Sequence, residues 1–286
     1  SRSQNYRVAF TEPYIFNLNA TAGLDVFKTS YRYPNLYTRE GTGFNLSSSW
    51  RFWKFWGASL VYSLENVEVS DVNEDLEYTN YYYYYYFQEG KRTISALNPV
   101  LYYSTVDSPI FPSSGTKLLF SYRYSGGVLG GDVDLHKFKV EGVQFFPLWK
   151  RKHTLGFHLV YNGLSAFGNQ YIPAYERYYM GGEQSIRGFD VYQIGPKDTT
   201  GYTFGGTKSI LFQAEYQIPV TKEFSFVMFY DVGNAYDLGR AIDLNDLYQS
   251  MGLEVKVYIP LLGVPIRLIF SYNPRLADVG EKHFVF

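Results

Sequence analysis

The sequence predicts an all-β fold, a transmembrane antiparallel up-and-down β-barrel, from three observations. Apolar and polar residues alternate with a period of two, the links between these segments alternate in length, and aromatic residues make up 20% of the 286 residues. Tyrosine and phenylalanine, at 30 and 23 residues, suit positions that are apolar on one side and wet on the other. No segment reaches the roughly 18 consecutive apolar residues of a membrane-spanning helix, which excludes a helical membrane protein.

The period of two divides the strand candidates into an apolar and a polar face. In residues 209–218, Phe212 and Tyr216 lie on the apolar face. Gln213 and Glu215 lie on the polar face. The same division recurs in residues 117–124, 154–162 and 252–257. A soluble sheet would bury the apolar face in a core, whereas a barrel would turn it toward lipid and keep the polar face in its lumen.

The links between the strands favour the barrel. About 13 strands can be counted, and short links rich in proline and aromatic residues alternate with longer, more polar links. The short links lie at residues 11–19, 51–56, 107–115, 146–153, 218–223 and 258–265, and the long links at 31–41, 65–90, 125–134, 163–206, 231–246 and 273–282. Such alternation is typical of an outer-membrane barrel, with tight turns on the periplasmic rim and loops outside. Beside the short turns, Trp53, Trp56, Phe146 and Trp149 are expected in the aromatic girdle at the membrane interface.

The strand count also predicts that part of the barrel is missing. Single-chain bacterial barrels usually have an even number of strands, whereas this count is odd, and residues 281–286 form about half a strand. The first strand runs into a short turn. We therefore expect an odd number of strands to be absent before Ser1, and the end of the last strand to be absent after Phe286.

Composition and motifs argue against catalysis, cofactors and nucleic acid. A net charge of −1 offers no basic surface for nucleic acid, and the lack of cysteine excludes a disulfide scaffold and a thiolate metal site. The scattered histidines, without the helical pair of a zinc site, are His136, His153, His158 and His283. No nucleophile elbow or phosphate-binding loop follows a strand. We therefore expect no enzyme activity, no catalytic residue, no metal and no cofactor.

One long loop carries a resemblance to a known family. Residues 178–196, YYMGGEQSIRGFDVYQIGP, resemble the sixth extracellular loop of the BamA family of outer-membrane assembly proteins. The matching positions are Gly181, Gly182, Ser185, Ile186, Arg187, Gly188, Phe189, Ile194, Gly195 and Pro196. Further matches follow the family's order at residues 11–15, 107–115, 229–237 and 270–274. Agreement of separated motifs across nearly the whole chain is specific, whereas the Arg-Gly-Phe tripeptide alone would be weak.

The resemblance implies that the roughly 13 visible strands belong to a barrel of about 16 in the bacterial outer membrane. Such a barrel inserts and folds other outer-membrane proteins at a seam between its first and last strands. Its partners would be client outer-membrane proteins, accessory assembly lipoproteins and outer-membrane lipid, including lipopolysaccharide. The family's soluble periplasmic repeats are absent, so residues 1–286 are expected to be the barrel domain alone. Two alternatives remain: a two-partner-secretion or translocation pore of the same superfamily, and a passive porin or outer-membrane enzyme.

Arg187 is the candidate functional residue. An arginine in a long loop is ordinarily a solvated surface charge, but the flanking glycines permit tight backbone turns, and neighbouring strands offer lumen-facing carboxylates. Glu215 follows the loop on the polar face of its strand, and Asp231 lies in the next strand. A loop folded into the barrel would set Arg187 against both carboxylates, in a contact costly to break in a confined lumen. The family resemblance points to the same residues. We therefore hypothesise that Arg187, Gly188 and Phe189 pin the loop to the inner wall, a structural rather than catalytic role.

A run of six tyrosines, Tyr81 to Tyr86, has two interpretations. It could form an aromatic surface for another protein or for lipopolysaccharide, or it could be a loop whose alternate rings pack on their neighbours. The second interpretation is favoured, because a run without period defines no geometry. High β-propensity and low charge make the run prone to strand pairing unless it is covered.

Overall fold

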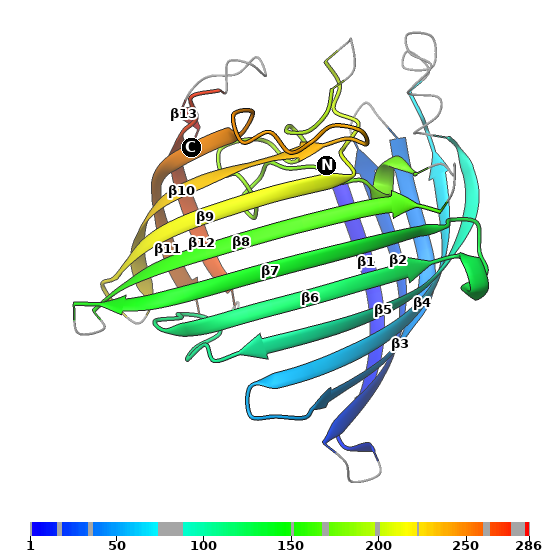
Figure 1. Ribbon diagram of the computed structural model, residues 1–286, viewed down its shortest axis with the longest axis horizontal. Coiled ribbons are helices and arrows are strands. Elements are labelled where there is room, and N and C mark those ends of the chain that lie inside the picture. Colours follow the sequence, from blue (N-terminus) through cyan, green and yellow to red (C-terminus); the bar gives the residue numbers. More distant parts are fainter. Residues whose placement is uncertain are drawn as a thin grey trace.

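The chain folds into one curved antiparallel sheet. The computed structural model describes all residues except 1, 16–18, 34–36, 74–87, 150–151, 168–171, 198–200, 222, 260–263, 276–283 and 286. The described residues form a 13-stranded sheet in which each strand pairs with its neighbours in sequence. In Figure 1 the strands follow one another around a curved wall. This arrangement confirms the predicted all-β, up-and-down architecture.

The strands are β1 (Arg2–Glu12), β2 (Ala20–Tyr33), β3 (Tyr37–Arg51), β4 (Trp56–Ser70), β5 (Gly90–Ser104), β6 (Gly115–Ser125), β7 (Leu135–Leu148), β8 (His153–Ala166), β9 (Lys208–Pro219), β10 (Phe224–Tyr236), β11 (Tyr248–Ile259), β12 (Val264–Tyr272) and β13 (Phe284–Val285). Two short 3-10 helices, η2 (Gly127–Leu129) and η3 (Ala174–Glu176), lie in the links. In the part of the chain that the structure describes, no helix is long and apolar enough to cross a membrane.

The period of two turns one face of the wall outward. Leu118 and Phe120 of β6, Leu159 of β8 and Leu253 of β11 are 45 to 53% exposed, although all four are large apolar residues. The alternate residues face inward and form hydrogen bonds with one another. For example, His158 Nδ1 lies 2.8 Å from the side-chain amide oxygen of Gln213. An apolar outside and a hydrogen-bonded inside are the arrangement of a barrel in lipid.

The predicted alternation of link lengths holds for most of the links but is wrong at two. Residues 31–41 were expected to form a long link, but β2 and β3 continue through them and pair Arg32 with Thr38 and Tyr33 with Tyr37. Aromatic and β-branched residues extend this ladder, leaving only residues 34–36 between the strands.

The second exception is the link between β5 and β6, which was expected to be short but occupies residues 105–114. The carboxylate of Asp107 organises this turn, because it accepts hydrogen bonds from the backbone N–H groups of Ser113 and Ser114, at 2.9 and 3.2 Å. A side chain that satisfies turn amides in this way stabilises a longer connection.

The link between β8 and β9 contributes residues to both buried apolar clusters of the described chain. Yellow-green in Figure 1, it folds over one end of the wall. Two clusters of buried apolar residues pack the link against the wall. The first joins Ile172 and Ala174 of the link to residues of β3, β4, β5, β7 and β8, including Ile94 and Leu135. The second joins Met180, Ile186, Phe189 and Ile194 of the link to Val160, Leu211, Ala235 and Tyr248.

Because one face of β6 is directed outward, substitution by arginine should affect stability very differently at neighbouring positions of this strand. We expect Phe120→Arg to lower the free energy of unfolding by about 2–4 kcal/mol, the cost of a lipid-facing cation near the middle of a bilayer. Leu119→Arg is the matched control, because its side chain would point inward beside Glu141, its partner residue across the ladder. Urea unfolding from lipid vesicles measures both. Equal losses for the two variants would contradict the assignment of the faces.

Candidate functional site

The loop that carries Arg187 turns back on itself inside the barrel. Met180 and Ile194 exchange backbone hydrogen bonds of 2.9 and 3.0 Å, and the N–H of Gly182 donates to the carbonyl of Phe189 at 2.7 Å. Gly181 has φ +105, and a Cβ there would collide with the carbonyl oxygen of Asp190. Glycine is therefore required where the two limbs of the loop approach each other.

The guanidinium of Arg187 is fully buried and meets the carboxylate of Asp231 on β10 in a bidentate pair. Its Nε and Nη2 donate to Asp231 Oδ2 and Oδ1 at 2.7 and 2.6 Å, and the backbone N–H of Arg187 adds a third bond of 3.1 Å. Nη1 donates to Glu215 Oε1 on β9 at 2.7 Å. The structure thus brings together the three charged residues that the sequence placed at the site.

Glu254, Lys256 and Arg267, which the sequence analysis did not assign to the site, complete this charged cluster. Arg187 Nη1 also donates to Glu254 Oε2 on β11, at 2.8 Å. Arg267 of β12 binds the same carboxylate with Nε and Nη2, at 2.6 and 2.7 Å. Lys256 Nζ lies 3.2 Å from Glu215 Oε2 and 3.7 Å from Glu254 Oε1. The alternation pattern did place Glu254 and Lys256 on the inward face. It does not indicate, however, how close these residues lie to Arg187 in the folded chain.

The charges of the cluster balance. Three cations, Arg187, Lys256 and Arg267, face three carboxylates, Glu215, Asp231 and Glu254. Arg187, Asp231 and Glu254 have fully buried side chains. An unpaired charge in such a place costs several kcal/mol, whereas a balanced and hydrogen-bonded set is tolerated. The cluster therefore fixes the loop against four consecutive strands without leaving a net charge in the interior.

Apolar contacts and tight backbone approaches hold the residues that flank Arg187. Phe189 is 3% exposed, and its ring meets Tyr248 edge-on at 5.6 Å. The backbone of Gly188 has φ +80 and lies so close to β12 that a Cβ would collide with the side chain of Ser271. Farther along, Gly195 precedes Pro196, whose carbonyl accepts the N–H of Phe204 at 3.0 Å. Gly188 and Phe189 thus hold the loop against the wall directly after the arginine, and Pro196 accepts a hydrogen bond within the link.

A contact of reversed polarity holds the first limb of the loop to β6 and β7, which lie on the other side of β8 from β9 in the same sheet. Glu176, in η3, is 4% exposed. Its Oε2 lies 3.0 Å from Lys137 Nζ on β7 and 3.3 Å from Arg123 Nη1 on β6. Burial alone would raise the pKa of Glu176, but Arg123 and Lys137 outweigh it and lower this pKa to about 2. The sequence analysis did not single out Glu176, since a lone acidic residue in a long loop gave no signal.

Other candidates from the sequence lie apart from this cluster. His136, His153 and His158 make separate ring-nitrogen contacts, with Tyr122, Tyr216 and Gln213. His283 and the tyrosine run Tyr81 to Tyr86 lie outside the described residues. Trp53, Phe146 and Trp149 are exposed at the ends of strands, and Trp56 packs on Tyr103 with the ring centroids 5.0 Å apart.

Fold and site together define a class of protein. An outward apolar wall, a hydrogen-bonded interior and a long loop held inside by a buried arginine make this an outer-membrane β-barrel with an internally fixed loop. A family model described as the Omp85 superfamily domain matches residues 1–286, and the chain belongs to this family. Its location is therefore the bacterial outer membrane, as the sequence analysis predicted.

Individual relatives agree with the family assignment. The chain is 26% identical over 287 aligned residues to the outer membrane protein assembly factor BamA of Nitratidesulfovibrio vulgaris, a match covering 99% of this chain and 35% of that protein. It is 25% identical to the sorting and assembly machinery component 50 homolog A of Xenopus laevis, over 72% of this chain and 42% of that protein. The chain thus spans less than half the length of either relative.

A solved structure shares the fold. The crystal structure of BamA from Haemophilus ducreyi lacking POTRA domains 1–3 superposes with a TM-score of 0.79 at 18% identity, covering 95% of this chain and 58% of that one. The resemblance to the BamA family inferred from the loop motif is therefore confirmed for the fold and the family.

Loss of the buried guanidinium should be costly. Arg187→Ala leaves Asp231 without its bidentate partner, and we expect the free energy of unfolding to fall by about 3–5 kcal/mol. Arg187→Lys should lie between this variant and the wild type, because one ammonium cannot reproduce the fork that spans Asp231 and Glu254. Urea unfolding from vesicles and heat-modifiable migration in gels give the readout. Wild-type stability in Arg187→Ala would contradict the proposed pin.

The Glu176 contact predicts an acid-sensitive contribution to stability. Because the pKa of Glu176 is about 2 in the folded chain and 4.5 ordinarily, its contribution is full above pH 4.5 and is lost as the pH falls toward 2. We expect Glu176→Gln to cost about 3 kcal/mol at neutral pH, and this difference from the wild type to shrink over that window. Urea midpoints of the two proteins, compared at each pH, measure it. A difference independent of pH would rule out the ion pairs as its source.

Proposed function

We propose that this barrel inserts and folds other β-barrel proteins into the bacterial outer membrane. The observation that carries the proposal is the Arg187 cluster, which fixes a long loop inside the wall beside strands β9 to β12. A passive porin needs an open, charged constriction, whereas here the inward charges are paired with one another and with the loop. Two relatives named for assembly support the same function.

The physical basis of insertion is strand pairing at a controllable edge. An unpaired backbone group in hydrocarbon costs several kcal/mol, so a barrel edge exposed to lipid templates an incoming strand. The family resemblance places that edge at the seam between the first and last strands. Insertion of this kind makes and breaks only hydrogen bonds between backbone groups. The proposed function therefore requires no catalytic residue and no cofactor.

The partners follow from this function. Client outer-membrane proteins would supply the incoming strands, and accessory assembly lipoproteins would act on the periplasmic side. Lipopolysaccharide and the other outer-membrane lipids would contact the exposed apolar band, which includes Phe120 and Leu159. The bacterial outer membrane is the one compartment where all these partners meet.

Client folding in liposomes tests the proposal. The complete protein that carries this chain should raise the folding rate of a small client barrel about tenfold or more over empty liposomes, equivalent to at least 1.4 kcal/mol of the barrier. Arg187→Ala should lose most of this acceleration. Lys139→Gln, which removes an inward cation on β7 that pairs with Glu141, is the control expected to keep it.

Conductance across the same membranes separates the alternatives. The assembly function expects low ion conductance, because the loop is held inside the wall by the Arg187 cluster. Steady conductance without any acceleration of client folding would replace the proposal with a secretion pore or porin, and Arg187 would then hold a plug.

A further inference from the structure

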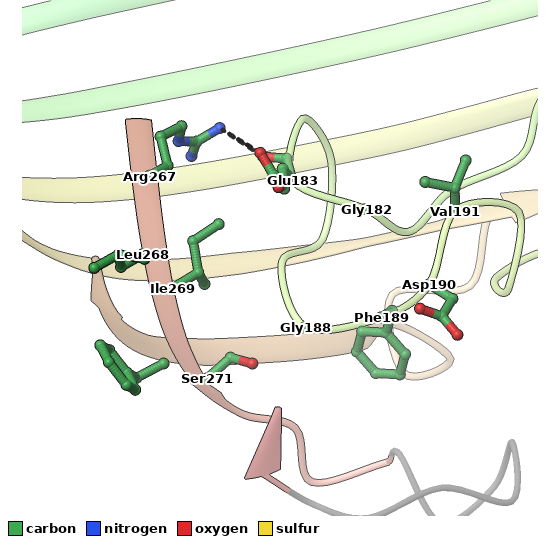
Figure 2. Close-up of a pocket in the computed structure, with 11 residues that line it drawn as sticks. Gly182, Glu183, Gly188, Phe189, Asp190, Val191, Arg267, Leu268, Ile269 and Ser271 are labelled. Atoms are coloured by element: carbon green, nitrogen blue, oxygen red, sulfur yellow. Dashed lines mark hydrogen bonds and ion pairs between the residues drawn. The ribbon is translucent and has the colours of Figure 1, made fainter. Parts of the chain in front are cut away.

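Strand β12 is attached to the Arg187 loop through a second arginine. Arg267 Nη1 donates to the backbone carbonyl of Glu183 at 3.3 Å, and its guanidinium lies 3.9 Å from the carboxylate of the same residue. Figure 2 shows the two side chains pointing toward each other from the strand and from the tip of the loop. Arg267 is therefore a direct bridge between β12 and the loop.

The two arginines share one carboxylate. Glu254 Oε2 accepts from Arg187 Nη1 at 2.8 Å and from Arg267 Nη2 at 2.7 Å, while its Oε1 accepts from Arg267 Nε at 2.6 Å. The carboxylate is fully buried. A displacement of Arg267 therefore changes the partners of the oxygen that also holds Arg187.

The Arg267 bridge matters because few other described contacts hold the inner side of β12. The strand pairs with β11 along its whole length, from Val264 to Tyr272. On its other side, β13 pairs with it only at Ser271 and Tyr272 among the described residues. Backbone pairing therefore holds the described part of β12 mainly from one side, and the loop is the other element that touches its inner face.

The loop and β12 meet at two points with a cavity between them. Arg267 meets Glu183 at one point, and Ser271 lies against Gly188 at the other. The cavity encloses about 510 Å³, and its lining includes Phe189 and Ile269. Since the loop does not pack on the strand between these points (Figure 2), the polar contact of Arg267 determines whether that end of the loop follows the strand.

We propose that Arg267 is a positioning residue that couples movements of β12 to the Arg187 loop. This inference rests on the proposed assembly function, in which a client strand pairs at the seam between the first and last strands. When β12 moves, Arg267 draws the shared Glu254 carboxylate and the loop tip with it. The loop and the strand then change position together rather than independently.

The test measures the distance between the loop and the strand and the rate of client folding in the same proteins. The chain has no cysteine, so cysteines introduced at Gln184 and Leu268 are the only ones in this domain to carry spin labels. In the complete protein in liposomes, the wild type should give one short-distance population. Arg267→Gln should add a longer population and slow client folding about tenfold, equivalent to one charge-assisted hydrogen bond.

Two further variants make the result specific. Arg267→Lys keeps the charge but cannot bind Glu254 with two nitrogens and reach Glu183 as well, so it should give a smaller longer-distance population. Arg7→Gln removes another inward arginine, which pairs with Asp25 at 3.5 Å on strands β1 and β2, and should change neither readout. Arg267→Gln should still fold, because Glu254 retains Arg187 and Lys256. If it does not, Arg267→Lys supplies the distance measurement.

The two readouts separate this inference from the proposed function. Distances identical to the wild type in the Arg267 variants would overturn the coupling, whatever the client does. Equal client folding with the wild-type protein and with empty liposomes would overturn the assembly function, while the distances would still decide whether Arg267 holds the loop to β12.

Discussion

The structure depends on a single buried guanidinium. Arg187 binds Asp231 through two nitrogens and uses the third for Glu215 and Glu254. These carboxylates come from three adjacent strands, so the loop can reach them only if all three strands are in register. A slip of one residue would turn a carboxylate toward lipid and leave the arginine unpaired in the interior. The loop path and the register of β9 to β11 therefore specify each other.

The loop is held at two places along the sheet by contacts of opposite sign. Toward β9 to β11 it presents Arg187 to carboxylates of the wall, and toward β6 and β7 it presents Glu176 to Lys137 and Arg123. Each apolar cluster lies beside one of these contacts and excludes water from it. Ion pairs of this kind add specificity where apolar packing alone would allow the loop to slide. A loop fixed to β6 and β7 as well as to β9 to β12 resists changes in the distance between these two groups of strands.

The sequence predicted the features that depend on local order along the chain. Alternation identified the outward apolar residues and the inward position of Glu215, and the glycines around Arg187 indicated a folded loop. Two links were misjudged because the alternation of apolar and polar residues does not show which residues pair across a link, as Arg32 pairs with Thr38. Nor does it show which side chains bind turn amides, as Asp107 binds Ser113. Glu254, Arg267 and Glu176 were missed for a related reason. Their closeness to the loop depends on the stagger of neighbouring strands and on the path of the loop. Neither of these produces a repeating pattern in the sequence.

A neutral cluster of paired charges differs from an apolar plug in one respect that matters for a barrel that must move. Apolar contact has no preferred direction, whereas a bidentate arginine–carboxylate pair fixes the relative orientation of its two partners. Glu254 lies between Arg187 and Arg267, so arginines of the loop and of β12 donate hydrogen bonds to the same carboxylate. If β12 and the loop move together, as proposed, Glu254 keeps both arginines as partners. The strand can therefore shift without leaving an unpaired charge in the interior.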